Sequence, residues 1–84
     1  MEHFTIELCT VNSCGVLHRI AGVYAKCKYN IDSMTVEPAA GNELSFMRIT
    51  SKGTQDECRH LLRLLARLYD VKSVVLSEKN DQNN

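Results

Sequence analysis

The stretch TVNSCGVLHRI, residues 10–20, contains the junction that decides the fold. Before it, apolar and more polar residues alternate over residues 4–9, which indicates a strand with one buried face. After it, apolar residues recur at spacings of three and four from 16 to 27, which predicts a helix with one apolar stripe. The small and polar residues 12–15 therefore form an elbow that leads from a strand into a helix.

Further strands follow the predicted helix, which should end near Lys28. Residues 29–38 are rich in β-formers and end at Pro38, the only proline of the chain. The turn PAAGNE has Gly41-Asn42 at its tip and is typical of a hairpin. We expect it to join the first of these strands to another at residues 43–51.

The last third of the chain predicts a helix and a strand. Thr54 and Glu57 match a capping box, and the leucines that follow give an amphipathic helix that ends at Asp70. Residues 71–77, VKSVVLS, read as a strand. We expect the polar residues 78–84 to be a disordered tail.

The order β-α-β-β-α-β predicts an α+β, ferredoxin-like domain over residues 1–77, with four antiparallel strands and both helices on one face. The other face of the sheet is not purely polar. In residues 43–51 we expect Leu44 and Phe46 to point to one face of the sheet, and Met47 and Ile49 to point to the opposite face. In the last strand we expect Val74 and Leu76 to point to one face, and Val71 and Val75 to the opposite face. Either these are ordinary surface methyl groups, or a partner, such as an identical copy, covers the sheet or extends its edge.

Composition narrows the classes of function. The chain has 84 residues, 44% of them hydrophobic, with ten basic and ten acidic side chains. One core of this size contributes only about 3–5 kcal/mol, so oligomerisation is expected. The balanced charge argues against nucleic-acid binding, and Arg59, Arg63 and Arg67 read as one solvated helix face. No stretch reaches the ~18 apolar residues of a membrane span and no signal peptide is seen, so we expect a cytoplasmic protein.

The sequence offers no catalytic or metal site. Cys9, Cys14, Cys27 and Cys58 lack CxxC spacing and read as reduced thiols. Only Cys14 and His18 are four residues apart, too little for a zinc site. No histidine lies beside a nucleophile with a third orienting group. Cys14 at a helix start could be a reactive thiol, or it could simply fill the elbow.

The elbow itself admits two interpretations. The first amides of a helix have no intrahelical partner, and Gly15 would let a ligand carboxylate approach them closely. Asn12 offers both a donor and an acceptor for a small zwitterion. Alternatively, Asn12 and Ser13 cap the helix and Gly15 only permits the bend; Ser13 is well placed as the N-cap.

Residues 7–38, ELCTVNSCGVLHRIAGVYAKCKYNIDSMTVEP, resemble the ACT domain, and in particular the N-terminal ACT domain of acetolactate synthase (acetohydroxyacid synthase) small subunits. The resemblance rests on Asn12 before Gly15, the helix GVLHRIAGVYA, the segment YNIDSMTVEP and the later LARLYDVKSVV. It covers about residues 3–77.

This resemblance implies a non-catalytic regulatory subunit that activates a large catalytic subunit and makes it sensitive to branched-chain amino acids, chiefly valine. No cofactor is expected on this chain, whereas thiamine diphosphate, Mg and FAD are expected on the catalytic partner. The resemblance also implies a homodimer that pairs its sheets side by side. Two alternatives remain: an interaction module that activates its enzyme without an effector, and a stand-alone amino-acid sensor for another enzyme.

The effector site that the resemblance implies lies between the elbow of one copy and the start of the second strand of the other. Its residues would be Asn12, Ser13, Cys14, Gly15, Val16 and Leu17, with Asn30 and Ile31 from the partner copy. The carboxylate would meet the amides near Gly15 and Val16, while Leu17 and Ile31 would form the apolar wall.

The chain departs from the family pattern in three places. Cys14 replaces a frequent proline or serine, and Lys28 replaces a glycine that often ends the helix. Many such subunits also carry a second domain, so the chain is either a short form or the first domain of a longer protein.

Overall fold

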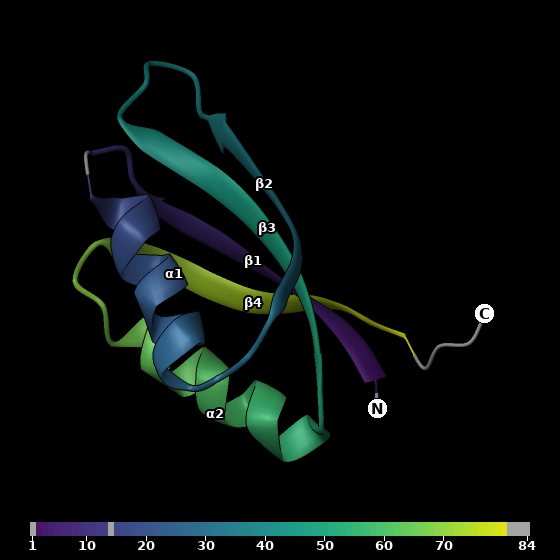
Figure 1. The fold of residues 1–84 in the computed structure, drawn as a ribbon. Coiled ribbons are helices and arrows are strands. Elements are labelled where there is room, and N and C mark those ends of the chain that lie inside the picture. Colours follow the sequence, from purple (N-terminus) through teal and green to yellow (C-terminus); the bar gives the residue numbers. More distant parts are fainter. Residues whose placement is uncertain (1, 14, 81–84) are drawn as a thin grey trace.

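The computed structural model describes residues 2–13 and 15–80. The chain forms β1 (Glu2–Val11), α1 (Val16–Lys26), β2 (Ile31–Pro38), β3 (Leu44–Gly53), α2 (Gln55–Ala66) and β4 (Val71–Asn80). Figure 1 shows both helices on one side of a twisted sheet, which they cover as a second layer. The predicted β-α-β-β-α-β order and ferredoxin-like fold are confirmed.

The sheet has the strand order β2-β3-β1-β4, and each neighbouring pair is antiparallel. The central strands are therefore β1 and β3, which pair without a register shift from Glu2↔Gly53 to Val11↔Leu44. Strands β2 and β4 form the two edges. Because β1 is central, the elbow that follows it starts from the most rigidly paired part of the sheet.

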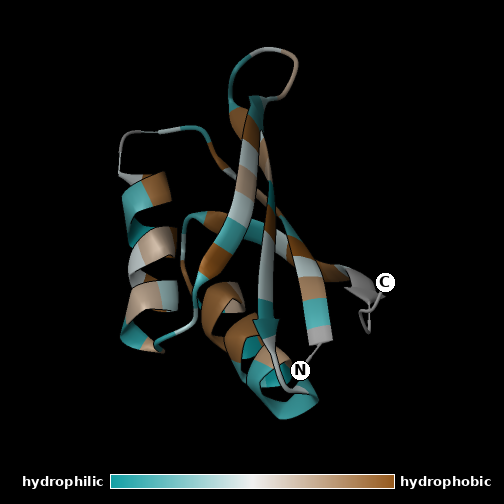
Figure 2. Cartoon of the chain, turned by 45° about the vertical axis from the view of Figure 1, so that its right-hand side comes forward, coloured by the Kyte–Doolittle hydropathy of each residue, from teal (hydrophilic) through white to brown (hydrophobic). Residues whose placement is uncertain are grey.

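The core lies between the sheet and the helices, and alternate strand residues enter it. Figure 2 shows this alternation of hydrophobic and hydrophilic residues along the strands. The buried core residues are Phe4, Ile6, Leu8, Val16, Ile20, Tyr24, Met47, Ile49, Cys58, Leu61 and Leu65. Each buried aliphatic side chain contributes about 1.5–3 kcal/mol relative to exposure. Burial raises the pKa of the Tyr24 phenol, with a smaller contribution from Cys58.

The outer face of the sheet carries two large exposed apolar side chains, Phe46 and Val75, each 52% exposed. Between them lies an ion pair in which Arg48 donates to Glu7. The predicted opposition of Phe46 to Met47 and Ile49 is confirmed, because the latter two are buried. Whether a partner covers the outer face stays a prediction.

One predicted orientation is wrong: Val71 does not share a face with Val75. The pairing of β1 with β4 shifts between Cys9 and Thr10, so Val71 lies opposite the buried Thr10. Such a bulge adds one residue to one strand and reverses the alternation beyond it. Val71 therefore packs against the core together with Val74.

Two element ends also differ from expectation. Helix α2 ends at Ala66, one turn before Asp70, and β4 continues to Asn80, because its last residues pair with Thr5, Phe4 and His3 of β1. The predicted tail is therefore a strand up to residue 80, and residues 81–84 lie outside the described part of the chain. Within the described residues, no helix is long and apolar enough to cross a membrane.

Helix α1 ends in a Schellman-type turn. Tyr29 N–H donates to the carbonyl of Tyr24 at 2.9 Å, and Lys28 N–H donates to that of Ala25 at 3.0 Å. Lys28 has φ of 64°, the left-handed conformation that glycine usually supplies at this position. The helix ends at Lys26, close to the predicted end near Lys28, and Lys28 carries a side chain at a backbone angle that favours glycine.

Candidate functional site

The site begins at the N-terminus of α1, where the elbow leaves the helix uncapped. The N-cap residue is Gly15, with φ of 89° and ψ of −14°, and no side-chain hydrogen bond caps the helix. No acidic residue stands in the first turn. The prediction that Ser13 is the N-cap is therefore wrong: its N–H donates to Val11 O at 3.1 Å, and the N-cap, Gly15, lies two residues later.

Gly15 is exposed, and its positive φ angle is one that glycine adopts without strain. A positive φ of this size costs a residue with a side chain about 1–2 kcal/mol. A side chain at Gly15 would have no atom of a non-neighbouring residue within 4 Å of its Cβ, so the space on that side of Gly15 is open. The amides of the first turn of an α-helix are unpaired donors at the positive end of its dipole. Val16 N–H donates to Ser13 O only at the long distance of 3.4 Å, so an anion here would meet a weakly held donor in a favourable field.

Asn12 ties the elbow to the β2–β3 hairpin. Its backbone N–H donates to Glu43 O at 3.0 Å, and its side-chain Nδ2 donates to Asn42 O at 2.9 Å. A carbonyl oxygen can only accept, so this bond fixes the orientation of the Asn12 carboxamide. Asn12 does not cap α1. The second polar atom of its carboxamide, Oδ1, can act only as a hydrogen-bond acceptor.

The remaining elbow residues divide between core and surface. Val16 is 2% exposed and packs in the core, so only its backbone can meet a ligand. Leu17, the next residue, is 44% exposed and presents an apolar side chain beside the open helix end. Ser13 is exposed. Cys14 lies outside the described residues, so its place in the effector site stays a prediction.

Asn30 and Ile31 are not brought to this end of the molecule. They lie beyond the C-terminus of α1, whose 11 residues span about 16 Å. Ile31 packs partly against the core, and Asn30 is exposed. Asn30 lines a polar depression of about 220 Å³ together with Lys28, Tyr29, Asp32, Lys52 and Glu57. Within one copy, the predicted site is therefore two separate halves at opposite ends of α1.

Strand β2 supplies an edge through which two copies could join. It pairs only with β3, and most of its residues are exposed. Val36 on β2 is 42% exposed, and Leu17 of α1 is a second exposed apolar residue. An unpaired strand edge presents a row of backbone donors and acceptors that can pair with another strand.

Two residues that the sequence indicated only as a turn tip and a helix end hold the elbow in place: Asn42, described above, and Asp70. Val11 N–H donates to Asp70 O at 2.8 Å, and Arg19 Nε donates to Asp70 Oδ2 at 2.7 Å. The hydrogen bond that Arg19 donates to Asp70 raises the pKa of the Arg19 guanidinium, against a smaller opposing effect of burial. The partners are 51 residues apart in sequence, so no local pattern reveals the pair.

The described residues contain no group of three or more potential metal ligands. Cys9 and Cys27 are free thiols.

A four-stranded sheet of order β2-β3-β1-β4, two covering helices and a glycine elbow with an open helix end define this chain as an ACT domain. The family model that matches residues 6–73 is the AHAS small subunit-like ACT domain, AHAS being acetohydroxyacid synthase. The chain belongs to this family, as its sequence resemblance indicated.

Relatives and solved structures agree with this assignment. The chain is 34% identical over 74 residues to acetolactate synthase small subunit 2, chloroplastic, of Arabidopsis thaliana, covering 88% of this chain and 16% of that protein. It is 28% identical over 81 residues to the acetolactate synthase small subunit of Buchnera aphidicola, covering 96% of this chain and 51% of that one.

The crystal structure of the acetolactate synthase small subunit from Thermotoga maritima shares the fold, with a TM-score of 0.80 and 24% identity over 88% of this chain and 46% of that chain. The present chain thus spans about half the length, or less, of the relatives named here.

Proposed function

We propose that this ACT domain is the regulatory, non-catalytic module of an acetolactate synthase small subunit, and that two copies bind one class of effector, a branched-chain amino acid such as valine, between them. The names of the matched relatives support the class of enzyme and imply a catalytic large subunit as partner. Thiamine diphosphate, Mg and FAD would then belong to that partner.

The observation that carries the proposal is the uncapped start of α1. In this site the effector carboxylate accepts hydrogen bonds from the amides near Gly15 and Val16, and it replaces the long bond, 3.4 Å, from Val16 N–H to Ser13 O. The space into which a side chain at Gly15 would project is open. A carboxylate there gains both hydrogen bonds and the favourable interaction with the helix dipole, about 0.3–1 kcal/mol for an exposed charge.

The ammonium group of the effector would be recognised by Asn12. Because the Nδ2 atom of Asn12 donates to Asn42 O, the remaining Oδ1 atom can serve as an acceptor for a cationic donor. The amides that donate to the carboxylate and the oxygen that accepts from the ammonium group thus come from neighbouring residues of one elbow. This spacing suits an α-amino acid, whose two charged groups share one carbon atom.

The aliphatic side chain of the effector would lie against Leu17 of one copy and the Asn30–Ile31 segment of the other. Leu17 is 44% exposed, and the two halves of the site lie at opposite ends of α1 in a single chain. A second copy brings them together when the copies pair in opposite directions along their β2 edges. The exposed Val36 of β2 supports this edge as the contact.

Regulation follows when effector binding changes how the two copies sit against each other. An effector that binds one arrangement more tightly shifts the equilibrium toward it, and a coupling of about 1–3 kcal/mol is typical. The catalytic subunit, bound to the dimer, would sense this shift.

A second candidate function is an interaction module that activates the enzyme without binding any effector. The outer face of the sheet favours it, because Phe46 and Val75 flank a depression of about 260 Å³ that offers a contact surface independent of the elbow.

Calorimetric titration of the purified chain with valine, leucine and isoleucine, after its dimeric state is established by ultracentrifugation, tests the proposal. We expect heat of binding with at least one of the three, and activation of the catalytic subunit that this amino acid changes. Activation without any such heat would reject the sensor and leave the interaction module. Binding without activation of acetolactate synthase would point to a sensor for another enzyme.

A further inference from the structure

The elbow is anchored on both flanks by one residue, Asp70, which follows α2. Its backbone carbonyl accepts from Val11 N–H at 2.8 Å, at the end of β1. Its side-chain Oδ2 accepts from Arg19 Nε at 2.7 Å and from the Arg19 Nη2 group, in the first turn and a half of α1. Residues 12–15, the elbow, lie between these two attachment points.

The burial of the two partners is unequal. The Asp70 side chain is 6% exposed, whereas the Arg19 side chain is 41% exposed. A carboxylate this deeply buried is stable only with a charged or hydrogen-bonding partner, so Asp70 holds Arg19 more firmly than an exposed ion pair would. The Arg19 guanidinium also lies over the Tyr69 ring, 5.4 Å from its centroid, which adds a cation–π contact.

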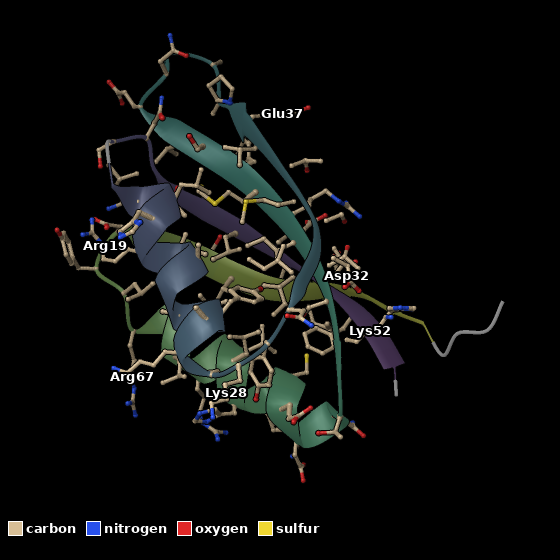
Figure 3. The ribbon with its side chains drawn as sticks, viewed as in Figure 1. Arg19, Lys28, Asp32, Glu37, Lys52 and Arg67 are labelled. Carbon is tan, nitrogen blue, oxygen red and sulfur yellow. The ribbon has the colours of Figure 1, made fainter. Side chains whose placement is uncertain are left out.

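These contacts direct Arg19 away from the open helix end. Figure 3 shows Arg19 on the side of α1 that faces the loop between α2 and β4. An arginine this close to a helix N-terminus has an unfavourable interaction with the dipole unless an acid neutralises it. Asp70 supplies this charge and ties the beginning of α1 to the beginning of β4.

From this geometry we infer that Asp70, acting through Arg19 and Val11, is a positioning residue that sets the angle between β1 and α1 and so holds the elbow amides ready for a carboxylate. Asp70 does not touch the effector. This inference rests on the proposed function for its effect on binding, but its effect on the elbow can be measured without any ligand.

The test uses Asp70→Asn, which keeps the backbone bond to Val11 and removes the charge that holds Arg19. In the ligand-free protein, ¹⁵N order parameters of the Gly15, Val16 and Leu17 amides should fall from ~0.85, the value of a rigid backbone, toward ~0.6, the value of a flexible one. In calorimetry, the dissociation constant for valine should rise about 10-fold. Arg19→Ala and the double variant should each give about the same rise as Asp70→Asn, because the two residues act as one unit.

Two controls separate positioning from general stability. Glu7→Gln breaks the ion pair with Arg48, on the outer face of the sheet, and should leave the order parameters of the elbow unchanged. Ile49→Val trims the core and lowers the free energy of unfolding by about 0.5–1.5 kcal/mol without contacting the elbow. Both should bind valine within about twofold of the unsubstituted protein.

The inference is overturned when the Asp70→Asn elbow stays as rigid as in the unsubstituted protein, or when its loss of affinity only matches that of Ile49→Val at equal loss of stability. A tighter affinity in Asp70→Asn would also overturn it, since Arg19 would then serve the carboxylate directly. Should the unsubstituted protein bind no amino acid, the proposed function fails, and the order parameters alone decide the role of Asp70.

Discussion

The two helices of this domain begin in opposite ways. Helix α2 starts at Thr54 with a complete capping box: Glu57 N–H donates to Thr54 Oγ1 at 3.1 Å, and Thr54 N–H donates to Glu57 Oε1 at 2.8 Å. Asp56 and Glu57 add negative charge to its first turn. Helix α1 starts at Gly15, with no cap bond and no acid.

The difference separates a helix start that the chain caps with its own side chains from one that it does not. Both helices follow central strands and cover the same sheet, so the fold alone does not require one of them to be uncapped. A missing cap costs about 1 kcal/mol. The chain satisfies amides of α2 with its own side chain, whereas no side chain caps α1 and Val16 N–H has only a long backbone bond, 3.4 Å, to Ser13 O. The predictions below alter one helix end at a time.

The largest effect should come from Gly15→Asp, which gives α1 an N-cap carboxylate of its own. The new side chain would accept from the first-turn amides that the effector needs, and its backbone would be strained at a φ of 89°. We expect calorimetry to show at least a ~100-fold loss of affinity for valine, equal to about 2.7 kcal/mol. The matched control is Gly22→Ala, a helical glycine with open space around it, which should bind normally. Normal binding by Gly15→Asp would refute the elbow site.

Asn12→Ala should have the next largest effect. It removes the bond to Asn42 O, which fixes the elbow against the hairpin, and the acceptor proposed for the ammonium group. Each lost hydrogen bond contributes about 0.5–1.5 kcal/mol, so we expect affinity for valine to fall about 10-fold or more. His60→Ala, on the exposed face of α2, serves as the control. An unchanged dissociation constant would remove Asn12 from the site.

Thr54→Ala tests the capped start of α2. Loss of the capping box should lower the free energy of unfolding by about 1 kcal/mol, measured by urea denaturation. Valine affinity should stay within about twofold, because α2 begins at the opposite end of the domain from the elbow. A loss of affinity as large as that of Asn12→Ala would mean that the two helix ends are not independent.

The smallest effect is expected at the C-terminal end of α1. Lys28→Gly places glycine at a φ of 64° and removes the steric cost of a side chain in the left-handed region. Thermal unfolding should show a gain of about 0.5–1 kcal/mol. A loss of stability would show that the lysine side chain contributes contacts that exceed its backbone strain.

The sequence predicted the elements well because their signals are local. Alternation identified the strands, a stripe of apolar residues identified each helix, and the capping box at Thr54 and Glu57 was confirmed with both of its bonds. The face of Val71 was predicted wrongly because a bulge between Cys9 and Thr10 depends on how β1 and β4 pair. No residue pattern within β4 encodes that shift.

The site was only partly predictable for a related reason. The positions of Gly15 and Asn12 could be read from the junction of strand and helix. Whether Ser13 or Gly15 would begin α1 depended on a backbone angle, and Ser13 was the wrong choice. The bonds from Asn12 to the hairpin and from Arg19 to Asp70 join residues 30 and 51 positions apart, and only the folded chain brings them together.

The most direct measurement follows the backbone amide signals of both helix starts by NMR while valine is added to the protein. The account predicts large shifts for Gly15, Val16 and Leu17, with signals of Asp56 and Glu57 at the start of α2 unchanged. Shifts confined to α2 or to the outer face, or saturable binding that leaves the Gly15–Leu17 amides unmoved, would contradict it.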